Sequence, residues 1–372
     1  MRIAQIAPLY ECVPPVAYGA TERIVHYLTE ALVQRGHDVT LFASGDSRTS
    51  AALIAACDGA LWRDPCAWDT SCHHIRQLEQ VARHAHDFDV LHFHGEPIHL
   101  PVMQRLRCAH VTTMHALMLP HDHGPLLREF AGAPLVSISE SQRKPIPWAN
   151  WVRTIYHGIP ADALPFEVSP HDYLLFLGRL MPGKRPDLAV EIARRARMQL
   201  KIAGVVHPGE REYFRNSLTP LLEQNATFAE FLGETGGQAR SRLLSRARAL
   251  LLPIEWEEPF GLVAIEAMAC GTPVIAFRRG AMTEIIEDGV NGWLVDDVDG
   301  AVAAVDRIGA IDRCDCRRAF ESRFTVSRMV DEYVELYSEL CAASEGKKSV
   351  AVAACQASSK NRRPARDCDR RA

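Results

Sequence analysis

The sequence predicts an α/β fold made of two doubly wound domains that face a cleft. The first observation is its length, because 372 residues exceed what one hydrophobic core usually supports. The second is the alternation of short β-rich runs with amphipathic helices, which is typical of parallel sheets. The third is a proline-containing stretch at 164–173, which interrupts the alternation before it begins again. We therefore expect a first domain over 1–165 and a second over 170–322.

Hydrophobic periodicity predicts the elements of the first domain. An apolar run at 2–8 predicts a strand, and apolar positions at helical spacing predict a helix over 21–36. Thr21 is the candidate N-cap of this helix, and Gly36 is its C-terminal stop. The later strands end in polar residues, which the fold should gather at one edge of the sheet. These strands are expected at 37–44, 88–94, 110–116, 134–139 and 152–158.

The alternation continues through the second domain and ends in a long helix. A helix should begin at Pro186 and another should run through 241–249. Residues 323–342 predict a C-terminal helix that packs back on the first domain, and 344–372 predict a disordered tail. The apolar positions of that helix are Met329, Tyr333, Leu336 and Tyr337. The second-domain strands are expected at 173–180, 200–206, 226–234, 249–253 and 273–280.

Composition excludes several classes of protein. The formal net charge of -4 gives no reason to expect a nucleic-acid partner. No run approaches the ~20 apolar residues that cross a bilayer, and the N-terminus has no signal-peptide pattern. The 11 cysteines are odd in number and scattered, which favours a reducing compartment. We expect a cytoplasmic protein without a transmembrane segment, and peripheral membrane contact stays open.

The segment 258–274, EPFGLVAIEAMACGTPV, carries two glutamates eight positions apart. Pro259 suits the first turn of a helix, which would place Glu258 just outside that helix and Glu266 about two turns inside. Eight helical residues advance about 12 Å, roughly the distance from the sugar to the ribose of an extended nucleotide-sugar. From the spacing alone, a core helix with two satisfied acids explains the pair equally well.

The first turn of the same helix is a candidate binding element. The backbone N–H groups around Phe260, Gly261 and Leu262 would lack partners inside the helix, so they form a positive end suited to an oxyanion or a sugar hydroxyl. Gly261 would also let a ligand approach the backbone closely.

A second cluster lies in 178–186, GRLMPGKRP, at the end of the first strand of the second domain. Arg179 and Lys184 flank a Pro-Gly turn, so two cations can converge at the edge of the cleft. Arginine offers a planar fork for phosphate oxygens, and lysine offers a mobile point charge. A solvated basic loop is the commoner fate of such residues, but the strand end beside an anion-ready helix favours binding.

The first domain adds a loop at 15–23, PVAYGATER. Gly19 and the helix that opens at Thr21 could bind an anion or let a substrate come close. The loop lacks the G-x-G-x-x-G pattern of dinucleotide folds, so it does not predict an NAD site.

Together these motifs resemble the retaining glycosyltransferases of family 4, over about residues 1–340. That family has a B-type fold (GT-B) of two Rossmann-like domains. The combination of YGATER, SISESQR, WVRTIYHGI and IEWEEPFGL is similar to a bacterial subgroup that includes avilamycin-pathway sugar transferases. The strongest matches are IAPLYECVPPVAYGATER at 6–23, GRLMPGKRP at 178–186 and EPFGLVAIEAMACGTPVIA at 258–276.

The resemblance implies a role for each matching position near the donor. Arg179 and Lys184 would hold the donor diphosphate and stabilise the leaving phosphate. Glu266 would accept hydrogen bonds from the ribose hydroxyls. Glu258 would contact the transferred sugar, with backbone donors beside it. Those donors are the N–H groups of Phe260, Gly261 and Leu262.

The remaining implied positions surround the two ends of the donor. Gly233 and Glu234 would lie near the nucleotide base, and Gly19 near the donor. His115, at a strand end of the first domain, would lie near the sugar. The family is expected to use a metal-independent front-face path through an ion-pair state, in a hexosyltransferase-type reaction without cofactor. The acceptor would be a hydroxyl of a saccharide, a lipid-linked sugar or a small molecule.

Two departures from the family pattern concern the sugar or acceptor pocket. Relatives usually have a second glycine where this chain has Ala20, and a glycine where it has Ala116. Each alanine adds a methyl group where close backbone approach is expected.

Two other functions remain as alternatives. A nucleotide-sugar epimerase has the same architecture and would form product without an acceptor. A metal hydrolase could use the His-x-His of His92 and His94, although no carboxylate or lysine ligand follows them in a recognisable context. The Asp-x-Asp sequences at 87–89 and 297–299 are more simply a turn and an acidic loop. We therefore expect no metal requirement.

Overall fold

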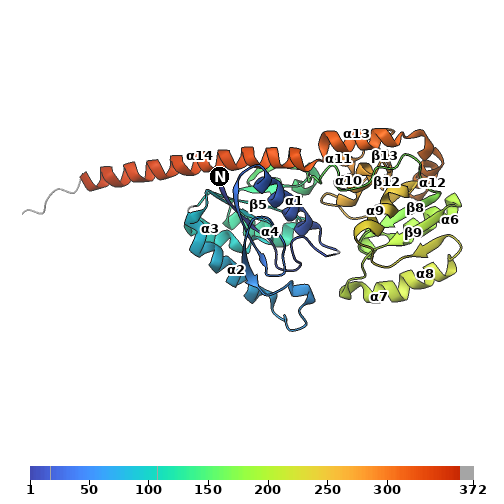
Figure 1. Cartoon of the computed structure of the whole chain (residues 1–372), viewed down its shortest axis with the longest axis horizontal. Coiled ribbons are helices and arrows are strands. Elements are labelled where there is room, and N and C mark those ends of the chain that lie inside the picture. The colour runs from blue at the N-terminus through green and yellow to red at the C-terminus, as the bar shows by residue number, and fades with distance from the viewer. Residues whose placement is uncertain (17, 107, 361–372) are drawn as a thin grey trace, which may run out of the picture.

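The computed structural model describes residues 1–16, 18–106 and 108–360, and shows two α/β domains (Figure 1). Each domain holds one fully parallel sheet, with seven strands in the first and six in the second. The expected two-domain α/β class is confirmed. Within the described residues, no helix is long and apolar enough to cross a membrane.

The first domain is built around a sheet in the order β3-β2-β1-β4-β5-β6-β7. Its strands are β1 Arg2–Ile6, β2 Asp38–Ser44, β3 Ala52–Cys57, β4 Val90–Phe93, β5 His110–Thr113, β6 Leu135–Ser137 and β7 Trp151–Thr154. Its helices are α1 Ala20–Gln34, α2 Thr70–His84, α3 Leu100–Leu106, α4 Pro120–Glu129 and α5 Glu140–Arg143. The strand order reverses between β1 and β4, and such switch points open a crevice at the carboxyl ends of the strands.

The second domain repeats this plan, with the sheet order β10-β9-β8-β11-β12-β13. Its strands are β8 Tyr173–Leu177, β9 Gln199–Ala203, β10 Ala229–Phe231, β11 Ala249–Leu252, β12 Val274–Phe277 and β13 Gly292–Val295. Its helices are α6 Pro186–Ala196, α7 Arg211–Tyr213, α8 Thr219–Gln224, α9 Gly237–Arg246, α10 Leu262–Ala269, α11 Met282–Ile285, α12 Val298–Arg307 and α13 Arg313–Arg323. Here the order reverses between β8 and β11, so the residues after these two strands meet at the second crevice.

The last helix, α14 Val326–Lys360, returns to the first domain and runs along it (Figure 1). The chain crosses back where Ile159 pairs with Thr325, beside Gly158. A Cβ atom on Gly158 would lie 2.2 Å from the Thr325 carbonyl oxygen, so this crossing accepts only glycine without a backbone shift. The apolar stripe of α14 is buried against α1 and the first sheet. Its buried residues there are Met329, Val330, Tyr333, Leu336 and Tyr337.

The structure differs from the sequence-based expectation at the start of α1 and in the C-terminal part of α14. Gly19, and not Thr21, occupies the N-cap position of α1, so Thr21 lies inside the first turn. The segment 344–360, expected to be disordered, continues α14 as helix because alanine, lysine and glutamate there have high helix propensity. Residues 361–372 of the expected tail lie outside the described residues.

Candidate functional site

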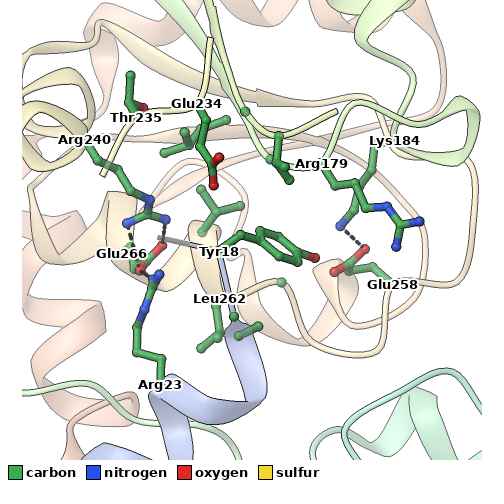
Figure 2. A pocket seen from close by; sticks show the side chains of 18 residues that line it. Tyr18, Arg23, Arg179, Lys184, Glu234, Thr235, Arg240, Glu258, Leu262 and Glu266 are labelled. Atoms are coloured by element: carbon green, nitrogen blue, oxygen red, sulfur yellow. Dashed lines mark hydrogen bonds and ion pairs between the residues drawn. The ribbon is translucent and has the colours of Figure 1, made fainter. Parts of the chain in front are cut away.

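A cleft lies between the two domains (Figure 2). The first domain contributes the loop before α1 and the first turn of that helix. The second domain contributes the loops after β8, β9 and β10, together with the start of α10. The charged and tyrosine side chains of the cleft are Tyr18, Arg23, Arg179, Lys184, Glu234, Arg240, Glu258 and Glu266.

Two cations stand at one end of this cleft, as the Pro-Gly turn predicts. Lys184 closes a short 3₁₀ turn, and its Nζ donates a 2.6 Å hydrogen bond to Glu258 Oε2. The ammonium also lies 5.1 Å from the ring centroid of Trp256. Arg179 forms an ion pair with Glu210, while its buried Nε has no partner among the described residues. Each cation therefore faces a carboxylate at the position where a phosphate could bind instead.

Glu258 lies in a turn ahead of α10 and not directly at its start. The helix begins at Leu262, with Gly261 as its N-cap at φ 88°, so the expected start at Pro259 is wrong. The left-handed backbone of Gly261 turns the chain, a conformation that glycine adopts at little cost. The 12 Å estimate for a continuous helix therefore does not apply between Glu258 and Glu266. The indole Nε1 of Trp256 donates a hydrogen bond to the same buried carboxylate of Glu258.

The first turn of α10 reaches the cleft only in part. Gly261, Leu262 and Val263 line the cleft, while Phe260 is 2% exposed and does not. The ring of Phe260 packs edge-on against His157 at 4.9 Å between centroids. Phe260 is thus an apolar support behind the turn, and any donor role falls to its backbone.

Glu266 lies at the other end of the cleft, bound by two arginines from different domains (Figure 2). Arg23 of α1 donates from Nη1 to Oε1 at 2.8 Å, and Arg240 of α9 donates to both carboxylate oxygens. Burial alone would raise the pKa of Glu266, but Arg240 and Arg23 outweigh that effect and lower it. The carboxylate is therefore ionised and able to accept hydrogen bonds from a diol.

Four residues with polar side chains line the cleft but are absent from the predicted site: Tyr18, Arg23, Thr235 and Arg240. Figure 2 shows the Tyr18 ring between the Glu266 cluster and the Lys184–Glu258 pair. The sequence did indicate that Glu266 needs cationic partners, because a glutamate buried inside an apolar helix is stable only when it is paired. Their identity could not be read from local spacing, since Arg23 and Arg240 come from distant segments.

The expected base end of the donor site is only partly at the cleft. Glu234 lines the cleft, while Gly233, at φ 73°, lies in the turn before Glu234 and does not. Gly19, which was expected near the donor, also lines the cleft. Ala20 also lines the cleft, so the methyl group expected to reshape it is present there.

His115 lies outside the residues that line the cleft, within a group of buried imidazoles. Its Nε2 is 3.0 Å from His94 Nδ1, and its ring stacks on His157 at 5.2 Å. Both nitrogens of His92 and both of His94 have hydrogen-bond partners, so neither ring has a nitrogen left for a metal. Among the described residues, no group of three or more potential ligands could hold a metal ion.

The burial of Glu22, in the first turn of α1, should make the stability of the protein depend on pH. Burial raises its pKa from 4.5 to about 7, so the folded state keeps a proton that the unfolded state has lost. Stability should therefore fall as pH rises from about 4.5 to 7 and then level off. We expect Glu22→Gln to stabilise the protein by about 1–3 kcal/mol at pH 8, with little effect at pH 4.5.

Thermal unfolding at both pH values measures this effect. Glu129→Gln, at an exposed position on α4, is the matched control and should change the melting temperature equally little at both pH values. A stability difference for Glu22→Gln that does not vary with pH would contradict the assignment.

Comparison with known families identifies both halves of the chain. The family described as "Glycosyltransferase Family 4" matches residues 21–161, and the family described as "Glycosyl transferases group 1" matches residues 166–314. The first range covers strands β2 to β7, and the second covers strands β8 to β13.

Curated relatives support the same class. The chain is 32% identical over 206 residues to a D-inositol 3-phosphate glycosyltransferase of Saccharomonospora viridis, covering 51% of this chain and 46% of that protein. It is 27% identical over 366 residues to a glycogen synthase of Mycobacterium tuberculosis, covering 82% of this chain and 85% of that protein. For the first of these, the matched part is thus about half of the relative's length.

Solved structures share the fold over nearly the whole chain. A glycosyltransferase involved in avilamycin A biosynthesis has a TM-score of 0.69 at 23% identity, covering 92% of this chain and 98% of that one. The Anabaena protein HepE in complex with UDP has a TM-score of 0.73 at 17% identity, covering 91% and 100%. The family models and the shared fold together place the chain among proteins with the two-domain fold of GT-B glycosyltransferases. The chain carries a family 4 type first domain and a group 1 second domain.

Proposed function

We propose that this enzyme is a retaining, metal-independent glycosyltransferase that moves a sugar from a nucleotide-diphosphate-sugar to a hydroxyl acceptor. The observation that carries the proposal is the layout of the cleft. Two cations and one carboxylate meet at one end, and a second carboxylate, Glu266, lies at the other. An elongated anionic ligand with a diol at one end complements this layout.

At the cationic end, Arg179 and Lys184 would bind the diphosphate in exchange for their present carboxylate partners. As the bond between the anomeric carbon and the phosphate oxygen breaks, negative charge grows on the leaving diphosphate. Fixed cations that face this charge stabilise the transition state more than the ground state. Glu258 would then contact the sugar, with the backbone N–H groups at the start of α10 close by.

At the opposite end, Glu266 would accept hydrogen bonds from the two ribose hydroxyls. Arg23 and Arg240 already use three acceptor positions of this carboxylate, so the ribose must replace at least one arginine contact. Arg23 belongs to the first domain and Glu266 to the second. Replacement of the Arg23 contact would exchange one interdomain ion pair for contacts with the ligand.

Retention is implied by the family resemblance, and the separation of the two acids disfavours one route to it. A double-displacement path requires a carboxylate nucleophile and an acid at the same bond. Here Glu258 and Glu266 lie in different parts of the cleft (Figure 2). A front-face path, in which the leaving phosphate receives the acceptor proton, requires only stabilisation of an ion pair by the cations.

Comparison with the solved structures supports a nucleotide donor. The HepE structures contain UDP, UDP with glucose, and UDP-glucose. By analogy we propose a uridine or related nucleoside diphosphate sugar as the donor. The avilamycin-pathway subgroup, a cytoplasmic location and the hydroxyl acceptor remain proposals that rest on the sequence.

A thermal-shift screen of nucleoside diphosphates and their sugars tests donor binding. A ligand at 100 times its Kd raises the stability of the folded state by about 2.7 kcal/mol. We expect a rise in melting temperature with at least one nucleoside diphosphate, and the same rise in the presence of EDTA. No shift with any nucleotide at millimolar concentration would contradict the donor site, and a shift abolished by EDTA would contradict metal independence.

The epimerase alternative is separated from transfer by its need for an acceptor. With the identified donor alone, an epimerase converts the nucleotide-sugar into a stereoisomer that retains the nucleotide. A transferase releases the nucleoside diphosphate and requires a hydroxyl acceptor for sustained turnover. Chromatography of the nucleotide products distinguishes the two.

A further inference from the structure

A continuous network of buried hydrogen bonds joins the first sheet to helix α14. Gln5 on β1 is fully buried and lies at its centre. Its Oε1 is 2.7 Å from His94 Nε2, and its Nε2 is 3.1 Å from the Tyr337 hydroxyl. His94 Nδ1 is in turn 3.0 Å from His115 Nε2. The network thus connects helix α14 to His115 through the amide of Gln5 and the imidazole of His94.

The lengths of the two contacts made by Gln5 agree with the orientation assigned to its amide. An N–H donor and an oxygen acceptor typically lie 2.7–3.2 Å apart, whereas a hydroxyl donor lies closer to its acceptor, at about 2.7–2.8 Å. The 3.1 Å contact with Tyr337 therefore fits the amide nitrogen as donor. The 2.7 Å contact with His94 fits the amide oxygen as acceptor.

This orientation determines where each proton lies along the chain of contacts. An amide oxygen can only accept, so His94 must carry its proton on Nε2. A neutral His94 then has a lone pair on Nδ1 and accepts from Nε2–H of His115. A neutral His115 with its proton on Nε2 has a lone pair on Nδ1.

The neutral state of both imidazoles agrees with their surroundings. Burial lowers the pKa of His94 well below its usual value and lowers the pKa of His115 to about 3. Neighbouring imidazoles reinforce the effect on His94. Neither ring therefore gains a second proton at neutral pH.

The far side of the network is anchored by α14. The Tyr337 hydroxyl lies 2.6 Å from His92 Nδ1, and His92 Nε2 lies 2.7 Å from the Thr113 hydroxyl. Thr113 also contacts the Tyr333 hydroxyl at 2.9 Å. Two tyrosines of α14 thus hold the strand ends of β4 and β5 in a single hydrogen-bond pattern.

One atom of the network has no partner. His115 Nδ1 is buried and without a hydrogen bond among the described residues. The His157 ring stacks on His115, and the far side of His157 meets Phe260 at the start of the donor-binding turn. A buried acceptor without a partner costs free energy, which a ligand hydroxyl would recover.

We propose that Gln5 and Tyr337 are positioning residues that hold His115 in the tautomer with a free acceptor at Nδ1. The sugar contact of His115 is what the family resemblance implies, so the effect of this tautomer on catalysis rests on the proposed glycosyltransferase function. The tautomer itself is a property of the protein without any ligand, so the two parts fail separately.

Nitrogen-15 NMR of histidine-labelled full-length protein tests the tautomer directly. In the unmodified protein we expect the His115 signals of a protonated Nε2 and a bare Nδ1, assigned by their loss in His115→Gln. A proton on Nδ1 would overturn the proposal, and this measurement needs no variant of Gln5 or Tyr337. In Gln5→Met, His94 loses the acceptor that fixes its proton, so the His115 signals should move toward the other tautomer. Tyr337→Phe should move them the same way but less.

A matched control separates positioning from general destabilisation. Gln77 is also a buried glutamine of the first domain, and its Nε2 donates to the carbonyls of Ala7 and Phe42. Gln77→Met should lower stability without moving the His115 signals. Movement in Gln77→Met equal to that in Gln5→Met would overturn the assignment.

Kinetics with the donor from the thermal-shift screen test the sugar contact. We expect Gln5→Met to lower kcat about tenfold, as for the loss of one hydrogen bond that strengthens in the transition state, while nucleoside diphosphate affinity stays within twofold. An altered tautomer with unchanged kcat would overturn the sugar contact alone. A protein that binds no nucleotide would overturn the proposed function and leave the tautomer result standing.

Discussion

Lys184→Ala is expected to lower kcat by about 10²–10³-fold, the loss seen when one preorganised group facing developing charge is removed. The ammonium lies at the cationic end of the cleft and has no covalent role, so its contribution is electrostatic. The fold should survive, because Glu258 keeps its hydrogen bond from Trp256 when the lysine is lost. Steady-state kinetics at saturating donor, together with thermal unfolding, measure both effects.

Two control variants sharpen this prediction. Lys184→Arg keeps the positive charge and should retain more activity than Lys184→Ala. Lys144→Ala removes an exposed lysine just after α5 and should leave kcat unchanged. A Lys184→Ala enzyme that folds normally and keeps kcat within twofold would exclude a role in stabilising the leaving group.

Glu266→Gln is expected to weaken the binding of a nucleoside diphosphate by about 10–100-fold, since hydrogen bonds to a charged acceptor contribute about 1.5–3 kcal/mol. Glutamine keeps the size of the side chain, whereas alanine would leave a cavity beside two buried cations. Loss of the negative charge also leaves Arg23 and Arg240 without their counterion, so the melting temperature should fall as well. Calorimetric titration measures the affinity.

The contact between Glu266 and the ribose hydroxyls is tested by comparing the affinities for a ribonucleotide and its deoxy analogue. The unmodified protein should bind a ribonucleoside diphosphate more tightly than its 2′-deoxy analogue, and Glu266→Gln should bind both equally weakly. Arg23→Gln removes only the first-domain cation and should bind the ribonucleotide no more weakly than the unmodified protein. Equal discrimination against the deoxy analogue before and after Glu266→Gln would refute the contact.

The sequence was a sufficient guide to the layered fold because most strands are buried on both faces. The run YLLFL of β8 and the run ALLL of β11 are fully buried, and continuous apolar runs of this kind predict parallel strands. The prediction omitted β3 and β13. β3, ALIAAC, is an edge strand with three exposed residues and several alanines, which have low strand propensity.

The charged residues of the cleft were predictable, but their pairings were not. Arg179, Lys184, Glu258 and Glu266 stand in recognisable local patterns, and the structure brings all four to one cleft. Their partners depend on contacts over long sequence distances: Glu266 pairs with Arg23, 243 positions away. The start of α10 was misplaced because a proline at 259 is compatible with a first helical turn, while the positive φ of Gly261 ends that possibility.

The return of α14 to the first domain has a consequence for the order in which the protein can fold during its synthesis. The core of the first domain contains Val330, Tyr333 and Leu336, which the ribosome adds after the whole second domain. Until these residues are added, the apolar stripe of α1 that they cover stays exposed to solvent. The first domain is therefore synthesised first, but its core is completed last. A fragment ending near residue 165 would lack part of its own interior. The second domain, whose sheet and helices all lie between 173 and 323, can close once residue 324 has been added, because Ile138 and Ile159 of its core are made before it.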